Sequence, residues 1–125
     1  MARILVVDDE DLPRQAVARL LEKAGHEVRE ANGGTAALAV WREGAADLVL
    51  TDLAMPDMNG FELVARLRET GETVPVLAVS GNVVVTDGEV LRHAELLARV
   101  HLLAKPFSRE QLLSAIASAL DRPAA

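Results

Sequence analysis

The sequence of 125 residues contains no cysteine and no tyrosine, and only 2% of it is aromatic. The lack of cysteine excludes disulfides, thiolate metal ligands and thiol nucleophiles. Trp41, Phe61 and Phe107 are too few to stack on nucleic acid bases, so the core must be aliphatic. Only four apolar residues separate Arg3 from Asp8, too few for a signal peptide core or a membrane span. We therefore expect a cytoplasmic protein with no membrane partner.

The charge balance is acidic. There are 13 Lys and Arg residues against 19 Asp and Glu residues, which gives a formal net charge of -6. Proteins that bind nucleic acids directly usually carry basic surfaces, so this activity is not expected. The length suits one compact domain over residues 1–125, able to bury about two-thirds of its unfolded surface.

Five short segments have the composition of β-strands. Three of them are almost continuously apolar, which is typical of parallel strands covered on both faces. The predicted strands span residues 4–7, 26–31, 47–51, 74–79 and 100–104.

Segments with helical spacing alternate with these strands, at residues 16–24, 36–41, 61–67, 90–97 and 112–120. Ser108 and Gln111 have the spacing of a capping box at the start of the last helix. Gly25, Gly44 and Gly71 stand where helices should end. Strict alternation predicts an α/β fold, an open, doubly wound, five-stranded parallel sheet with helices on both faces.

Polar residues stand where the predicted strands end, and in such sheets ligands bind at that edge. The strand ends carry Asp8 and Asp9, Asp52, Ser80 and Lys105. Three carboxylates in one cleft repel each other, and one lysine offsets them only in part. A hard divalent cation with oxygen ligands would supply the missing charge, so the sequence predicts a Mg²⁺ site. A metal, an ammonium group and a hydroxyl beside a carboxylate also suit transfer of a phosphoryl group to that carboxylate.

Four motifs in order resemble the receiver domain of bacterial two-component response regulators. They are Ile4–Glu10, Asp52–Pro56 with Asn59 and Gly60, Ala78–Gly81, and Lys105–Phe107. The resemblance covers essentially the whole chain. It implies a flavodoxin-like strand order of 2-1-3-4-5.

The resemblance also implies a role for each site residue. Asp52 would accept a phosphoryl group from a sensor histidine kinase or phosphotransfer protein. Asp8, Asp9, Asp52 and the backbone carbonyl of Ala54 would hold Mg²⁺. Ser80 would be the switch hydroxyl and Lys105 the cation that pairs with the phosphoryl group. A downstream protein would bind the fourth helix, fifth strand and fifth helix, and the Lys105–Pro106 bond is expected to be cis.

The sequence departs from the family pattern at Leu102, where an aromatic residue is often found. Coupling of an aromatic rotamer to Ser80 is therefore not expected. The segment from Ser80 to Lys105 looks longer than usual and contains Val83–Val85, which either pack on the sheet or form a partner surface.

Other interpretations of these residues remain open. The acidic run from Asp8 could simply favour the dipole of the first helix. A metal-dependent phosphatase with an aspartyl-phosphate intermediate and a phosphate-independent interaction module are the alternative functions; the adjacency of Asp8 and Asp9 disfavours the phosphatase. His26, His93 and His101 are expected to be structural or solvated, and Trp41 to cover the core only partly.

Overall fold

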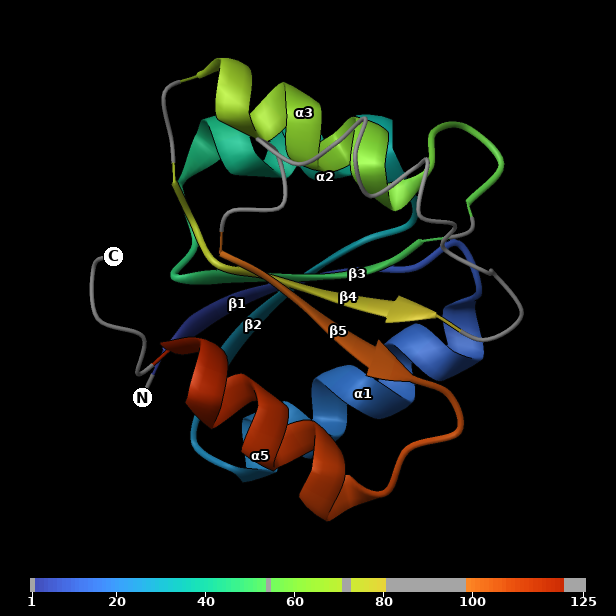
Figure 1. Ribbon diagram of the computed structural model, residues 1–125, viewed down its shortest axis with the longest axis vertical. Helices are drawn as coiled ribbons and strands as arrows, with labels where there is room; N and C mark the ends of the chain where they lie inside the picture. The colour runs from blue at the N-terminus through green and yellow to red at the C-terminus, as the bar shows by residue number, and fades with distance from the viewer. Residues whose placement is uncertain (1, 54, 71–72, 81–98, 121–125) are drawn as a thin grey trace.

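A parallel β-sheet forms the centre of the computed structural model, which describes residues 2–53, 55–70, 73–80 and 99–120. Helices α1 and α5 cover one face of the sheet and α2 and α3 cover the other (Figure 1). The elements are β1 (Arg3–Val7), α1 (Asp11–Lys23), β2 (Glu27–Ala31), α2 (Gly34–Glu43), β3 (Leu48–Asp52), α3 (Gly60–Glu69), β4 (Val76–Ser80), β5 (Val100–Ala104) and α5 (Arg109–Leu120).

The strand order is β2-β1-β3-β4-β5, with every neighbouring pair parallel. This confirms the predicted fold class and order. The chain runs from β1 outward to β2 and then crosses to β3 on the other side of β1, so the order reverses between β1 and β3. In register, Val7 lies beside Thr51 and Asp52 beside Val79. The carboxyl ends of the central strands therefore form one rim.

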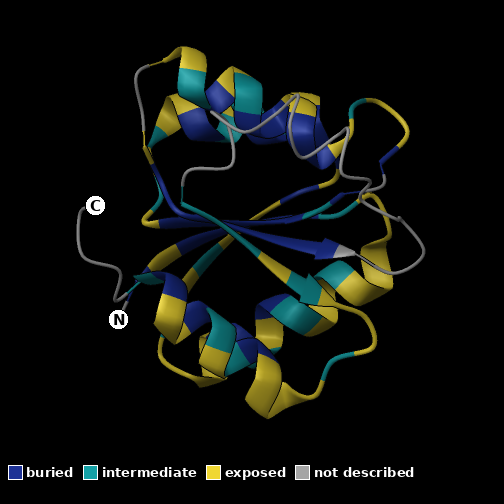
Figure 2. Ribbon diagram, in the orientation of Figure 1, coloured by how far each residue is buried: buried dark blue, intermediate teal, exposed yellow. Residues whose placement is uncertain are grey.

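Two aliphatic cores lie on the two faces of the sheet, and β1 contributes to both. Leu5 and Val7 face the core with α2 and α3, whereas Ile4 and Val6 face the core with α1 and α5. The alternate side chains of one strand thus enter different cores, which explains the unbroken apolar runs. Figure 2 shows the central strands as buried. Burial of each such side chain contributes about 1.5–3 kcal/mol.

Trp41 corrects one expectation. It is only 8% exposed and belongs to the core between the sheet and helices α2 and α3. Trp41 shares the buried face of α2 with Gly34 and Ala37, so it fills this core rather than covering its edge.

Local signals fix several helix ends. Gly25, in the left-handed region with φ of 98°, follows α1. The capping box of α5 is confirmed, because the Ser108 N–H donates to Gln111 and the Gln111 N–H donates to the Ser108 hydroxyl. Gly71 and the predicted helix at 90–97 lie outside the described residues.

The described helices are short, and α1 with 13 residues is the longest of them. Within the described ranges, no helix combines the length and apolar character needed to cross a bilayer.

Asp57 joins the connection after β3 to the start of α2. Its carboxylate accepts the N–H groups of Gly34 (3.3 Å), Thr35 (3.0 Å) and Met58 (2.9 Å). The residue before α2 is Gly33, which has no side chain to cap the helix. Asp57 therefore supplies the missing acceptor from a segment more than twenty residues away. The hydrogen bond from the Thr35 N–H is the largest cause that lowers the pKa of Asp57. Slight burial raises this pKa, but the hydrogen bonds together outweigh it.

Replacing Asp57 with alanine is expected to destabilise the protein by about 1 kcal/mol at neutral pH, as for loss of a helix cap. Because folding lowers the pKa of Asp57, its stabilisation is present above the ordinary pKa of aspartate and is lost as pH falls through the folded pKa. Urea unfolding of the wild type and the Asp57→Ala variant should therefore converge in acid. Asp57→Asn, which keeps one acceptor oxygen, should lie between them. Equal stability of wild type and Asp57→Ala at neutral pH would contradict this role.

Candidate functional site

Asp52 and Lys105 meet at the carboxyl rim of the sheet. Asp52 is the last residue of β3, and Lys105 directly follows β5. The Lys105 Nζ donates to the Asp52 Oδ2 over 2.9 Å. The side chain of Asp52 is 13% exposed, so this contact is largely shielded on the carboxylate side. The predicted meeting of these two strand ends is confirmed, and the Lys105–Pro106 bond is cis as expected.

Asp8 follows β1 and faces the same group of charges. Burial is the main cause that raises the pKa of Asp8, and the negative charges of Asp52 and Asp9 raise it further. The N–H of Glu10, which donates to Asp8 Oδ1 over 2.9 Å, and the charge of Lys105 act in the opposite direction. The net rise means that burial, helped by the charges of Asp52 and Asp9, disfavours the ionised carboxylate of Asp8 more than Glu10 and Lys105 favour it.

The pKa of Lys105 is shifted by the same carboxylates. Partial burial alone would lower the pKa of Lys105. The hydrogen bond and charge of Asp52, together with the charges of Asp8 and Glu10, outweigh burial and raise this pKa. Lys105 is therefore firmly cationic at neutral pH.

A small cavity of about 50 Å³ lies beneath these charges. Asp8, Arg14, Asp52 and Lys105 line it together with aliphatic side chains and Phe107. The aliphatic wall keeps water away from one side of the carboxylates. Interactions between charges are stronger there than in open solvent.

The backbone at Asp52 is held by its neighbours. The buried Thr51 hydroxyl donates to the Asp52 carbonyl over 3.0 Å, and the Gly60 N–H donates to the Leu53 carbonyl over 3.0 Å. A Cβ at Gly60 would lie 2.7 Å from Leu53 Cδ2 and 3.1 Å from the Asp52 carbonyl oxygen. Gly60 thus lets α3 begin directly against the end of β3, and Asn59 caps that helix by accepting the Glu62 N–H.

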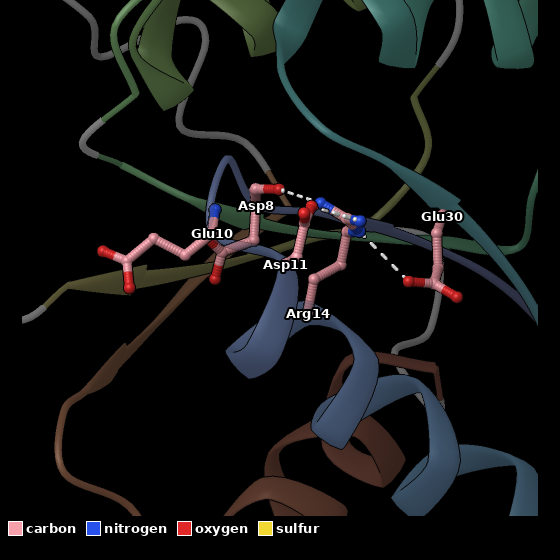
Figure 3. Close-up of polar contacts among 5 residues, drawn as sticks. All are labelled: Asp8, Glu10, Asp11, Arg14 and Glu30. Atoms are coloured by element: carbon pink, nitrogen blue, oxygen red, sulfur yellow. Dashed lines mark hydrogen bonds and ion pairs between the residues drawn. The ribbon is translucent and has the colours of Figure 1, made fainter.

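Sequence reasoning missed Arg14 and its partner Glu30. Arg14 lies in the first turns of α1, and its side chain lies between Asp8 and Glu30 (Figure 3). It is only 11% exposed, although arginine side chains are usually solvated. The one available signal was an arginine close behind an acidic run. Nothing in the sequence pointed to Glu30 on β2.

The donor groups suit Mg²⁺ chemically, since this ion takes one or two carboxylates and keeps several waters. Asp8 and Asp52 provide carboxylates at a rim with excess negative charge, and the nearby Asp9 is exposed. Within the described residues, no three His, Cys, Asp or Glu side chains are grouped closely enough to hold a metal. The predicted gathering of three carboxylates is therefore looser than a preformed cage.

The structure describes only some of the other residues that the sequence singled out. Ser80 ends β4, as predicted, and Ala54 and Val83–Val85 lie outside the described residues. Leu102, at the position often aromatic in the family, is 57% exposed on β5. His26 accepts the Ala2 N–H near the start of β1, far along the strand from the rim, which agrees with a structural role.

Comparison with known proteins identifies the family. The model of the response regulator receiver domain matches residues 4–117. The solved structure of the chemotaxis protein CheY4 from Vibrio cholerae is similar, with 34% sequence identity and a TM-score of 0.84. That similarity covers 96% of this chain and 99% of the CheY4 chain.

Longer proteins contain similar regions. The sensor kinase CckA of Brucella abortus is 34% identical over 97% of this chain, and the DNA-binding transcriptional regulator NtrC of Bradyrhizobium is 37% identical over 96%. This chain spans only 13% of CckA and 24% of NtrC. The family model and these similarities, together with the strand order and the rim, show that the chain belongs to the response regulator receiver domains of two-component systems.

Proposed function

We propose that residues 1–125 act as a single cytoplasmic receiver that switches partners when Asp52 is phosphorylated. A sensor histidine kinase or phosphotransfer protein donates the phosphoryl group. Asp8, Asp9, Asp52 and the carbonyl of Ala54 hold Mg²⁺, Lys105 pairs with the phosphoryl group, and Ser80 responds to it. The contact between Lys105 and Asp52, beside an Asp8 with a raised pKa, is the observation that supports this proposal most directly.

Asp52 has the environment of an acceptor. One of its oxygens accepts from Lys105, which neutralises part of the negative charge that would repel an approaching phosphoryl group. The backbone contacts of Thr51 and Gly60 hold the end of β3, so the carboxylate presents a defined oxygen to the incoming phosphorus.

The proposed transfer replaces one bond to phosphorus with another. A carboxylate oxygen of Asp52 forms a bond to phosphorus while the bond from phosphorus to the histidine nitrogen of the donor breaks. The imidazole leaves with the bonding electron pair and takes up a proton. Mg²⁺ held by Asp8, Asp9, Asp52 and the carbonyl of Ala54 would supply positive charge for the phosphoryl oxygens. Lys105 then pairs with a phosphoryl oxygen in place of the carboxylate oxygen that it contacts in this structure.

Phosphorylation shifts a population only if it stabilises one conformation more than another. Hydrogen bonds to a charged group contribute about 1.5–3 kcal/mol each, so several new bonds to the phosphoryl group, that of Ser80 among them, are enough to change the dominant state. The proposed partner surface comprises the helix predicted at residues 90–97, β5 and α5, and Leu102 of β5 is exposed. The protein turns over only its own phosphoryl group and is not an enzyme for external substrates.

The acceptor assignment is tested by intact-mass measurement with a small phosphodonor such as acetyl phosphate. With Mg²⁺ present, the wild type is expected to gain the mass of one phosphoryl group, and Asp52→Asn is expected to gain none, because the amide oxygen is a poor nucleophile. Asp47→Asn is the matched control, since Asp47 immediately precedes β3 at the opposite end of the same strand. It should be labelled like the wild type.

The other possible results of this labelling experiment would each support a different conclusion. Labelling of Asp52→Asn would place the acceptor on another residue, and equal labelling in EDTA would contradict the role of Mg²⁺. No labelling of any variant would favour the phosphate-independent interaction module. Continuous release of phosphate from small esters would favour the phosphatase.

Asp8→Asn is expected to stabilise the metal-free protein at neutral pH. Because folding raises the pKa of Asp8, the stability linked to its protonated form is present below the ordinary pKa and lost as pH rises through the folded pKa. The ionised carboxylate is therefore unfavourable at neutral pH, and asparagine removes its charge while still accepting the Glu10 N–H. Solvent screening of this half-buried group limits the gain to about 1 kcal/mol, or about 2–5 °C in Tm.

Thermal melts with and without Mg²⁺ measure both parts of this prediction. Mg²⁺ should raise the Tm of the wild type, because the ion binds the folded state, and should raise that of Asp8→Asn much less. A lower Tm for Asp8→Asn in EDTA would show that Asp8 does not carry this unfavourable charge, and an undiminished response to Mg²⁺ would show that Asp8 does not help to hold the ion.

A further inference from the structure

The side chain of Arg14 connects three separate parts of the chain beside the candidate site. Its Nη1 donates to the main-chain oxygen of Asp8 over 3.0 Å. Its Nη2 donates to Asp11 Oδ1 over 2.7 Å, and its Nε donates to Glu30 Oε1 over 3.0 Å. Figure 3 shows these contacts from the turn after β1, through α1, to β2. One rigid guanidinium thus links the acidic turn to a neighbouring strand.

The ion-pair partners of Arg14 are Asp11 and Glu30 rather than the carboxylates of Asp8 and Asp52. Partial burial alone would lower the pKa of Arg14, but the hydrogen bonds and charges of Asp11 and Glu30 raise it. Those two carboxylates already balance its positive charge. Its contact with Asp8 is to the main-chain oxygen, whereas its contacts with Asp11 and Glu30 are to carboxylates. Its effect on Asp8 is therefore geometric.

The contact of Arg14 completes a set of restraints on Asp8. The Asp8 N–H donates to the Ala31 carbonyl over 3.1 Å, its main-chain oxygen accepts from Arg14, and its side chain accepts the Glu10 N–H. Ala31 is adjacent to Glu30, so the guanidinium and the backbone bond tie the same two segments together. Because Asp9 lies between two restrained residues, its backbone direction is set by them.

We propose that Arg14 is a positioning residue for the metal-binding pair Asp8 and Asp9, supported by Glu30. The inference rests on the proposed function, because it assigns Arg14 to the Mg²⁺ site of that function. The described residues contain no tightly grouped set of three metal ligands, so the carboxylates must be aimed correctly when the ion arrives. Partners that orient metal ligands typically contribute 10–100-fold to metal affinity.

Lysine cannot replace Arg14 in this role. Its single ammonium is a compact charge, whereas the planar guanidinium reaches three acceptors in fixed directions. An Arg14→Lys variant keeps the charge and loses the planar set of donors, so it distinguishes positioning from simple electrostatics. Methionine at the same position keeps much of the apolar stem that lines the cavity.

The test measures the Mg²⁺ affinity of the unphosphorylated protein by isothermal titration calorimetry. Arg14→Met and Arg14→Lys are both expected to bind Mg²⁺ about 10–100-fold more weakly than the wild type. Glu30→Gln should show a smaller loss in the same direction. The double variant Arg14→Met/Glu30→Gln should be no weaker than Arg14→Met alone, because both changes remove one shared support.

Arg29→Met is the matched control for a purely structural effect. Arg29 on β2 also contacts one carboxylate and two carbonyls, those of Glu43, Val40 and Gly44, but on the α2 side of the sheet. Its loss should lower Tm in EDTA without changing Mg²⁺ affinity. If Arg14→Met fails to fold, Glu30→Gln carries the same test.

The outcomes separate this inference from the function on which it rests. Wild-type Mg²⁺ affinity in both Arg14→Met and Glu30→Gln would overturn the positioning role while the acceptor role of Asp52 still stands. Full affinity in Arg14→Lys would also overturn it, because charge alone would then be sufficient. A wild type that binds no Mg²⁺ would overturn the metal site itself, and the role of Arg14 with it.

Discussion

Repulsion among carboxylates at the end of a parallel sheet is the constraint on which the rest of this structure depends. The parallel register brings the residues after β1 and at the end of β3 to one rim, and both are acidic. An aliphatic cavity on one side of the rim withholds water from these groups. Burial and the charges of Asp52 and Asp9 together raise the pKa of Asp8, although the charge of Lys105 opposes this rise. The two aliphatic cores must stabilise the fold against this unfavourable cluster.

The same repulsion makes the rim suitable for chemistry. In the proposed function, Asp8, Asp9 and Asp52 would hold a divalent cation, whose charge would reduce the repulsion between the Asp52 carboxylate and an incoming phosphoryl group. The folded protein therefore holds carboxylates close together although they repel each other, and a bound ion would reduce that repulsion. Unfavourable charge in the resting protein and the proposed affinity for Mg²⁺ would then have the same origin.

The sequence predicts the parts of the molecule that depend on local pattern. The central strands are read from apolar runs, because each strand faces a core on both sides, and the polar residues that interrupt those runs mark the rim. Asp8, Asp52 and Lys105 follow from that rule. The contacts of Arg14 with Glu30 and of Asp57 with Thr35 do not, because they join residues 16 and 22 positions apart and depend on how a helix is oriented against a strand or turn. Trp41 was misjudged for a related reason, since its depth depends on how closely α2 approaches the sheet.

The distribution of restraints around the rim indicates where a phosphoryl group would act. On the β1 side, Asp8 is held at its N–H, its main-chain oxygen and its side chain. On the β3 side, Asp57 ties the following turn to α2, and Gly60 lets α3 begin against Asp52. Lys105 instead follows the edge strand β5, where Leu102 and Ala104 are exposed. New negative charge on Asp52 meets restrained backbone on the β1 and β3 sides, so in the proposed switch the response of Ser80 and the pairing of Lys105 would carry the effect toward β5 and the partner surface beside it.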